Sequence, residues 1–182
     1  MSICIESPKL VVIIEKILRL HTVYLLLGSN KGDRLKYLLL ARYFLRMKAG
    51  EIVKTSGIYV TEPWGKMKQA NYLNQALILK TDKTPFQLLK ITQKIEKGLG
   101  RTNKHFNSAR IIDIDILFFD ELVLKAKNLA IPHPRLHLRN FTLQPLLELN
   151  RSYTHPVLAK SIEELAKDCA DTGKVSIFKP LK

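Results

Sequence analysis

Hydrophobic and polar residues are arranged along the chain in two kinds of segment. Runs rich in β-branched, aromatic and leucine residues, which are typical of strands, occupy 22–30, 51–60 and 74–81, and the first of them ends in a Gly-Ser-Asn turn. Between the first two runs, leucines recur at helical spacing from Arg34 to Met47. The pattern therefore predicts strand, helix, strand and strand over this part of the chain.

A second helix and a further strand follow. Thr84 as N-cap, Pro85 at the first helical position and Gln87 at the third form a capping box, so we expect a helix from about Pro85 to Lys97. The segment 109–120 is apolar enough for a strand inside a core. The order βαββαβ is that of an α+β, ferredoxin-like core, in which an antiparallel sheet carries both helices on one face.

The remaining segments surround this core. Residues 121–131 are predicted to form a hairpin, and Ser161 with Glu164 marks a capped helix near the C-terminus. A chain of 182 residues with 46% hydrophobic content has the size of one domain, which we expect over 22–182. Residues 1–21 carry a helical apolar stripe interrupted by charges; we interpret them as an accessory helix or extension, too short and too charged to cross a bilayer.

Two carboxylates interrupt the apolar strand at 109–120. Because side chains alternate along a strand, Asp113 and Asp115 share one face, with a spacing of about 6.6 Å. The same alternation puts Leu117 and Phe119 with the aspartates, and on the other face Arg110, Ile112, Ile114, Ile116 and Phe118. Two interpretations stay open: the pair holds metal ions against a ligand, or it lies on a solvated face and pairs with surface Lys or Arg.

The charge of the chain bears on this choice. A formal net charge of +14 favours phosphate-bearing ligands, whether nucleotide, nucleic acid or acidic lipid. Arg101, Lys104, His105 and Arg110 directly precede the aspartates, and cations beside carboxylates suit a polyphosphate bridged by Mg²⁺. Taken without the aspartates, this basic cluster would be interpreted as a solvent-exposed group of charged side chains.

Several other classes of site lack their motifs. Neither GxxxxGK[ST] nor GxGxxG is present, which excludes the usual P-loop and Rossmann sites, and there is no GxSxG context for a serine nucleophile. The only cysteines, Cys4 and Cys169, form neither a zinc motif nor a disulfide framework, which fits a cytoplasmic protein.

Six segments, taken in order, resemble one enzyme family. They are "LLLGSN", "TEPWG", "YLNQALIL", "ITQKIEKGLGR", "ARIIDIDILFF" and "IPHPRLHLRNFTLQPLLEL". Together they are similar to the 6-hydroxymethyl-7,8-dihydropterin pyrophosphokinase family of folate biosynthesis, over about Thr22 to Leu149. The resemblance implies a ferredoxin-like, three-layer αβα fold. It also implies transfer of diphosphate from ATP to the pterin hydroxymethyl group, which releases AMP.

The resemblance also implies roles for individual residues. Asp113 and Asp115 would hold two Mg²⁺ ions and, with Arg101 and Arg110, form the catalytic set. The pterin would stack between Tyr72 and Phe141. Its remaining contacts would be Gly28, Ser29, Asn30, Thr61, Pro63 and Asn74, and the nucleotide would meet Gln93, Glu96, Arg101, Arg110, Ile116, His133 and Arg139. The implied partners are small molecules, ATP and the pterin, with no nucleic acid and no membrane, and a monomer is expected.

Two alternatives come from other classes. An RNA-binding module of the RRM type shares the βαββαβ order and a basic surface, but it should carry aromatics in a K/R-G-F-G-F-V-type motif, which this sequence lacks. A ligand-free regulatory domain of the same fold would need neither the aspartate pair nor the arginine cluster.

Overall fold

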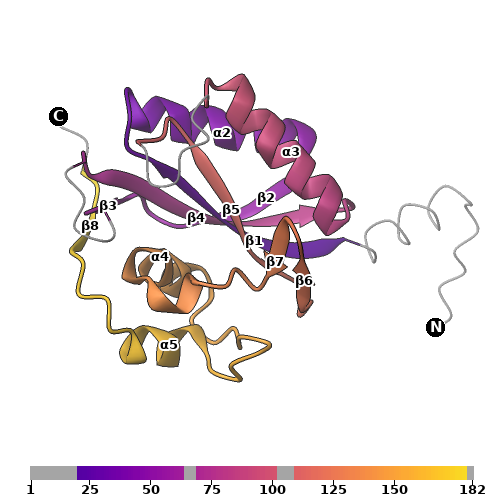
Figure 1. Ribbon diagram of the computed structural model, residues 1–182, viewed down its shortest axis with the longest axis vertical. Helices are drawn as coiled ribbons and strands as arrows, with labels where there is room; N and C mark the ends of the chain where they lie inside the picture. The colour runs from indigo at the N-terminus through magenta and orange to yellow at the C-terminus, as the bar shows by residue number, and fades with distance from the viewer. Residues whose placement is uncertain (1–19, 64–68, 102–108, 180–182) are drawn as a thin grey trace, which may run out of the picture.

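One antiparallel sheet organises the chain (Figure 1). The computed structural model describes residues 20–63, 69–101 and 109–179. The strands pair in the order β5–β1–β4–β3–β8, and β2 also pairs with β4; every pairing is antiparallel. The strands are β1 (His21–Ser29), β2 (Glu51–Thr55), β3 (Tyr59–Thr61), β4 (Tyr72–Thr81), β5 (Asp113–Phe119) and β8 (Val175–Ile177).

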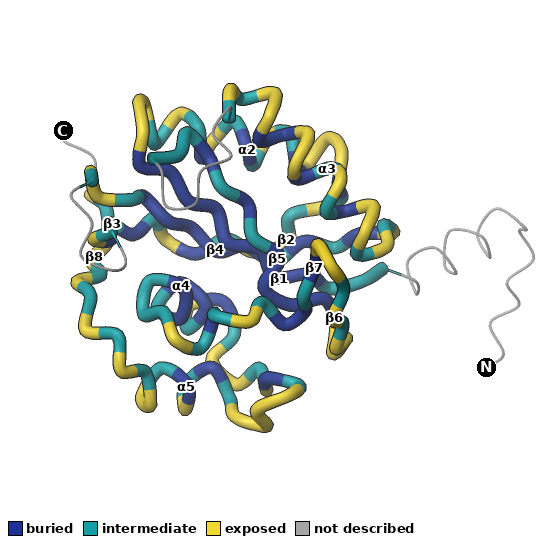
Figure 2. Tube along the Cα trace, in the orientation of Figure 1, coloured by how far each residue is buried: buried dark blue, intermediate teal, exposed yellow. Residues whose placement is uncertain are grey.

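Helices cover both faces of this sheet, which makes three layers (Figure 1). On one face lie α2 (Arg34–Lys48) and α3 (Pro85–Gly98), and on the other α4 (Asn140–Asn150) and α5 (Ile162–Asp168). Figure 2 shows the strands dark and buried between helices whose outer sides are exposed. The two predicted helices of the first layer are confirmed, whereas α4 was not predicted from the sequence.

Each face of the sheet has its own core because side chains alternate along the strands. In β1, Val23, Leu25 and Leu27 pack with α2 and α3, while Tyr24 and Leu26 pack with α4 and α5. Strand β4 alternates in the same way. The second core explains why the sheet is covered on both sides.

The predicted capping boxes are both present. In α3, Gln87 N donates to Thr84 Oγ1 over 3.3 Å, and Thr84 N donates to Gln87 Oε1 over 2.9 Å. Ser161 and Glu164 form the same reciprocal pair at the start of α5. The predicted hairpin is also confirmed as β6 (Leu124–Ala126) and β7 (Leu129–Ile131), and the short helix η1 (Leu136–Leu138) follows.

The predicted alternation in 109–120 is wrong at both ends. Strand β5 begins only at Asp113, so Arg110 precedes it and pairs with Asp113 rather than facing away. Opposite β1, Tyr24 pairs with Phe118 and Leu25 with Ile116, which leaves Leu117 as a β-bulge. Phe118 therefore packs toward α4, and Phe119 packs in the core with α2 and α3.

The predicted strand over 51–60 is interrupted. Ser56 accepts a hydrogen bond from Ala76 N through its side-chain Oγ at 3.0 Å, so a serine side chain replaces a strand carbonyl at this point. The chain therefore forms two strands, β2 and β3, on either side of this serine.

The predicted N-terminal extension covers residues 1–21. Residues 1–19 of it lie outside the described residues, and His21 is the first residue of β1. No helix in the described parts of the chain is long and apolar enough to span a membrane.

Candidate functional site

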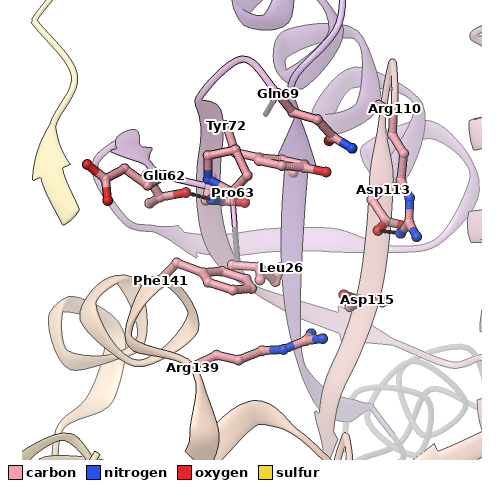
Figure 3. Close-up of a pocket in the computed structure, with 13 residues that line it drawn as sticks. Leu26, Glu62, Pro63, Gln69, Tyr72, Arg110, Asp113, Asp115, Arg139 and Phe141 are labelled. Carbon is pink, nitrogen blue, oxygen red and sulfur yellow. Dashed lines mark hydrogen bonds and ion pairs between the residues drawn. The ribbon is translucent and has the colours of Figure 1, made fainter. Parts of the chain in front are cut away.

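A pocket opens on the α4 side of the sheet, where β1 ends and β4 and β5 begin (Figure 3). Its sheet side is made by residues that share one face of the three strands, Leu26, Gly28, Asn74, Asp113 and Asp115. Around them lie Thr61, Glu62, Pro63, Gln69, Tyr72, Arg110, Arg139 and Phe141. The fold thus joins residues from most of the segments on which the family resemblance rests.

Two aromatic rings define one half of the pocket. Figure 3 shows Tyr72, at the start of β4, and Phe141, in the first turn of α4, on opposite sides of the opening. The Arg139 guanidinium carbon lies 5.4 Å from the centre of the Phe141 ring, within cation–π range. Rings facing across an opening suit a flat heterocycle.

The polar edge of this half is buried and tightly packed. Asn74 Nδ2 donates to Thr61 Oγ1 over 2.7 Å, and both residues are nearly inaccessible. A Cβ added at Gly28 would lie 2.8 Å from Asn74 Oδ1, so only glycine fits there without displacing the amide. Thr61 fixes the amide nitrogen of Asn74, and the carbonyl oxygen adjoins Gly28 at the pocket wall.

The other half of the pocket is a charged cluster around Asp113. Arg101 Nη1 lies 2.6 Å from Asp113 Oδ1, and Arg110 Nη1 binds the second carboxylate oxygen. Arg101 Nη1 also pairs with Glu96 Oε1 at 2.5 Å, and that oxygen accepts a hydrogen bond from Ile114 N over 2.8 Å. Glu96 therefore ties α3 to the start of β5 and holds Arg101 beside the aspartate.

Asp115 lines the pocket two residues after Asp113, on the same face of β5. Burial raises the pKa of the Asp115 carboxyl, and the nearby Asp113 charge raises it further, while Arg139 and Arg110 oppose the shift. Burial likewise raises the pKa of Glu96, with Arg101 opposing. A carboxylate whose ionised form is disfavoured gains from a cation beside it.

Some residues predicted for the site lie next to the pocket rather than in its wall. Ser29 and Asn30 are buried behind it, and Gln93 is exposed on α3. Ile116 points into the core shared with α2 and α3, the face opposite the aspartates. His133 is half-buried, and its backbone N donates to Leu117 O over 2.9 Å.

Three residues of the wall were missed by the sequence prediction. Leu26 could have been found, because it precedes Gly28 by two residues and so shares its face. Glu62 could also have been found, because it lies in the segment "TEPWG" between the predicted Thr61 and Pro63. Gln69 lies outside the six segments of the resemblance, and no periodic pattern indicated it.

The carboxylates fit the requirements of Mg²⁺. This ion is commonly held by one or two carboxylates together with phosphate oxygens of a substrate, and hard oxygen ligands are what Asp113 and Asp115 offer. The described residues contain no group of three or more His, Cys, Asp or Glu side chains that could hold a metal alone. Water and phosphate oxygens are the ligands that commonly complete the coordination of Mg²⁺ beside one or two carboxylates.

An aromatic slot beside a cluster of arginines and carboxylates is the arrangement expected of a protein that binds a flat ring next to a phosphate-bearing ligand. Comparison with known proteins then identifies the family. Residues 24–151 match the model of 7,8-dihydro-6-hydroxymethylpterin-pyrophosphokinase (HPPK). The chain belongs to this family.

Relatives with curated names agree. The chain is 43% identical over 143 residues to the 2-amino-4-hydroxy-6-hydroxymethyldihydropteridine pyrophosphokinase of Aquifex aeolicus, covering 79% of this chain and 89% of the relative. It is 44% identical over 130 residues to the enzyme of the same name from Bacillus subtilis, covering 71% and 78%.

Solved structures support the fold. Wild-type HPPK-DHPS of Plasmodium falciparum matches with a TM-score of 0.66 at 18% identity, over 82% of this chain and 44% of that chain. The same protein with pteroate gives a TM-score of 0.68 at 19% identity, over 82% and 42%. This chain thus spans less than half of those larger proteins.

Proposed function

We propose that the described pocket transfers diphosphate from ATP to 6-hydroxymethyl-7,8-dihydropterin, giving the pterin diphosphate and AMP. As a member of its family the chain is a pyrophosphokinase of folate biosynthesis. The observation that carries the assignment to this pocket is the position of the Tyr72–Phe141 slot directly beside Asp113 and its arginines.

The pterin occupies the aromatic slot. Its ring stacks between Tyr72 and Phe141, and its polar edge meets Asn74 and Thr61, whose mutual hydrogen bond orients the amide. Pro63 and Gly28 complete the wall, while Ser29 and Asn30 support it from behind. The hydroxymethyl group then points toward the aspartates, because these lie across the sheet from the slot.

The arginines receive the phosphates. Arg101 and Arg110 both engage Asp113, and Arg139 extends into the pocket from the start of α4 (Figure 3). When phosphate oxygens enter, the guanidinium groups of Arg101 and Arg110 bind them in place of the Asp113 carboxylate. Asp113 then becomes available for other contacts. Catalysis is mainly positioning and charge neutralisation, since phosphoryl transfer demands little covalent chemistry of the protein.

Asp113 and Asp115 are the residues that would hold Mg²⁺, two ions in our proposal. Bound there, Mg²⁺ would supply neutralisation of phosphate charge. The two carboxylates lie on one face of β5, where both would be available to such ions.

The nucleotide extends toward α3 and the segment before α4. Glu96 contributes by positioning Arg101, and Gln93 lies one helical turn earlier on the same side of α3. His133 lies near Arg139, and we place both beside the nucleotide. Any contact of Ile116 with the nucleotide is through its main chain, because its side chain packs in the core.

The ferredoxin-like arrangement and a single domain over 22–182 belong to the same proposal. Both are supported by the strand order, with β1 and β4 central, and by the placement of α2 and α3 on one face. A monomeric, cytoplasmic enzyme stays a prediction. The RNA-binding alternative is disfavoured, because α4 and α5 cover the sheet face on which an RRM stacks bases.

The test is an assay with Mg·ATP and 6-hydroxymethyl-7,8-dihydropterin, in which AMP should form only when the pterin is present. Asp115→Asn should lower turnover by at least about 10²-fold, because it removes a charge used in the transition state. It should fold normally, because the ionised form is disfavoured by burial. Glu121→Gln, an exposed acid elsewhere, is the matched control. A folded wild-type chain that forms no AMP would refute the proposed function.

A further inference from the structure

Asn30 holds the backbone of a catalytic arginine from two sides. It follows β1, is 3% exposed and lies outside the pocket wall. Its backbone N donates to Arg110 O over 3.0 Å, and its side-chain Oδ1 accepts from Arg110 N over 2.7 Å. Both polar groups of the Arg110 main chain thus bind one residue that is 80 positions away in the sequence.

The other end of the same side chain reaches the opposite wall. Asn30 Nδ2 donates to Gln69 Oε1 over 3.0 Å and to Ala70 O over 3.4 Å. Gln69 lines the pocket and precedes Tyr72 by three residues. One buried amide therefore links the segment that carries Arg110 with the segment that leads to the aromatic slot.

Arg110 depends on such support because it stands before the strand. Pairing of β5 with β1 begins at Asp113, so sheet hydrogen bonds do not fix Arg110. Its guanidinium nevertheless has to meet Asp113. The Asn30 amide accepts a hydrogen bond from Arg110 N through Oδ1 and donates to Gln69 Oε1 and Ala70 O through Nδ2. Neither Ala nor Leu has a side-chain acceptor or donor for these groups.

We infer that Asn30 is a positioning residue, which acts on the reaction through Arg110 and makes no contact with the pterin. This inference rests on the proposed function of the pocket. It replaces the role in the pterin site that the family resemblance implied for Asn30. It also explains why a buried polar residue directly follows β1.

The test is a double-mutant cycle on Asn30→Ala and Arg110→Ala in the full chain. Asn30→Ala should lower kcat by about 10²-fold, because small misplacement of a catalytic group has effects of this size. It should also weaken binding of a nonhydrolysable ATP analogue with Mg²⁺, while pterin binding stays within about twofold because the stacking rings are intact. In the Arg110→Ala background, Asn30→Ala should cost nothing further for the nucleotide.

Two further variants sharpen the result. Asn30→Asp keeps the acceptor for Arg110 N but loses the donors to Gln69 Oε1 and Ala70 O, so it should recover only part of the nucleotide binding that Asn30→Ala loses. Asn150→Ala is the matched control, since it removes the amide's hydrogen bonds with Tyr24 Oη and Ser152 Oγ, and none of these residues lines the pocket. It should leave kinetics and binding unchanged.

The outcomes separate the hypotheses. Equal losses in the wild-type and Arg110→Ala backgrounds, or parallel losses of pterin and nucleotide binding, would overturn the positioning role. Full activity of a folded Asn30→Ala variant would overturn it as well. A wild-type chain that forms no AMP would instead refute the proposed function, so the two failures are distinguishable.

Discussion

Gly28 shows how the polar edge of the pocket depends on a missing side chain. The nearest atom to a Cβ at this position would be Asn74 Oδ1, at 2.8 Å. Asn74 cannot retreat freely, because Thr61 binds its amide nitrogen. The close approach of β1 to β4 therefore sets the position of the group that we expect to recognise the pterin.

Gly28→Ala should weaken pterin binding by roughly tenfold or more, because the displaced Asn74 amide loses a buried hydrogen bond. Binding of the ATP analogue should change little. Titration of both ligands by fluorescence or calorimetry measures this contrast. Gly98→Ala is the control, since a Cβ there meets nothing within 4 Å; equal effects of the two substitutions would contradict the role of Gly28.

At this scale the sequence predicted some contacts and not others. Strand alternation correctly put Asp113 and Asp115 on one face, because a two-residue spacing survives any change of register. It could not show that Arg110 reaches back to Asp113, since that depends on where the strand begins. The interaction of Asn30 with Arg110 was equally hidden, because it joins residues 80 positions apart.

Among the elements, those with local signals were predicted well. The capping boxes of α3 and α5 are satisfied by residues within each helix, so their starts could be read directly. Helix α4 has Pro145 in its interior and apolar residues around much of its circumference, because it packs between the sheet and α5. This pattern resembles neither an amphipathic helix nor a strand.

The break between β2 and β3 also has a tertiary cause. Ser56 Oγ serves as acceptor for the buried Ala76 N, which a regular strand would have satisfied with its backbone. Nothing in the run 51–60 indicates this exchange, because the partner lies 20 residues further along.

Ser56→Ala should lower the free energy of unfolding by about 1–3 kcal/mol, because Ala76 N would lose its acceptor in a buried place. Chemical denaturation monitored by circular dichroism measures the change. Ser176→Ala, at an exposed position of β8, should have almost no effect. If both variants unfold at the same denaturant concentration, the hydrogen bond does not stabilise the break.

For the whole molecule, the helical layer formed by α4 and α5 makes the free energy of unfolding depend on pH. The connection from β7 to α4 buries His133 near two arginines, Arg139 and Arg135. Burial, followed by these charges, lowers the pKa of His133 to about 4. The folded state therefore favours the neutral ring, whereas the unfolded chain protonates it at the ordinary value of 6.5.

Between pH 6.5 and 4, His133 binds more protons in the unfolded chain than in the folded one, so acid favours unfolding. Stability should fall as the pH drops from about 6.5 toward 4, by on the order of 2–3 kcal/mol from this residue. His133→Gln should show a shallower loss over the same interval. Urea unfolding of both proteins at several pH values measures the difference, and parallel curves would exclude His133 as the cause.

The bulge at Leu117 also bears on how this strand can change in length. Asp115 must face the pocket while Phe118 and Phe119 fill cores on opposite sides, and the unpaired residue reconciles these demands. Inserting one residue between Asp115 and Phe118 would invert either the aspartates or the aromatic pair, whereas removing Leu117 itself would restore plain alternation and leave both on their present faces. From the aspartates to the end of β5 the strand therefore tolerates no single-residue insertion, and Leu117 is the one residue in it whose loss would keep both faces.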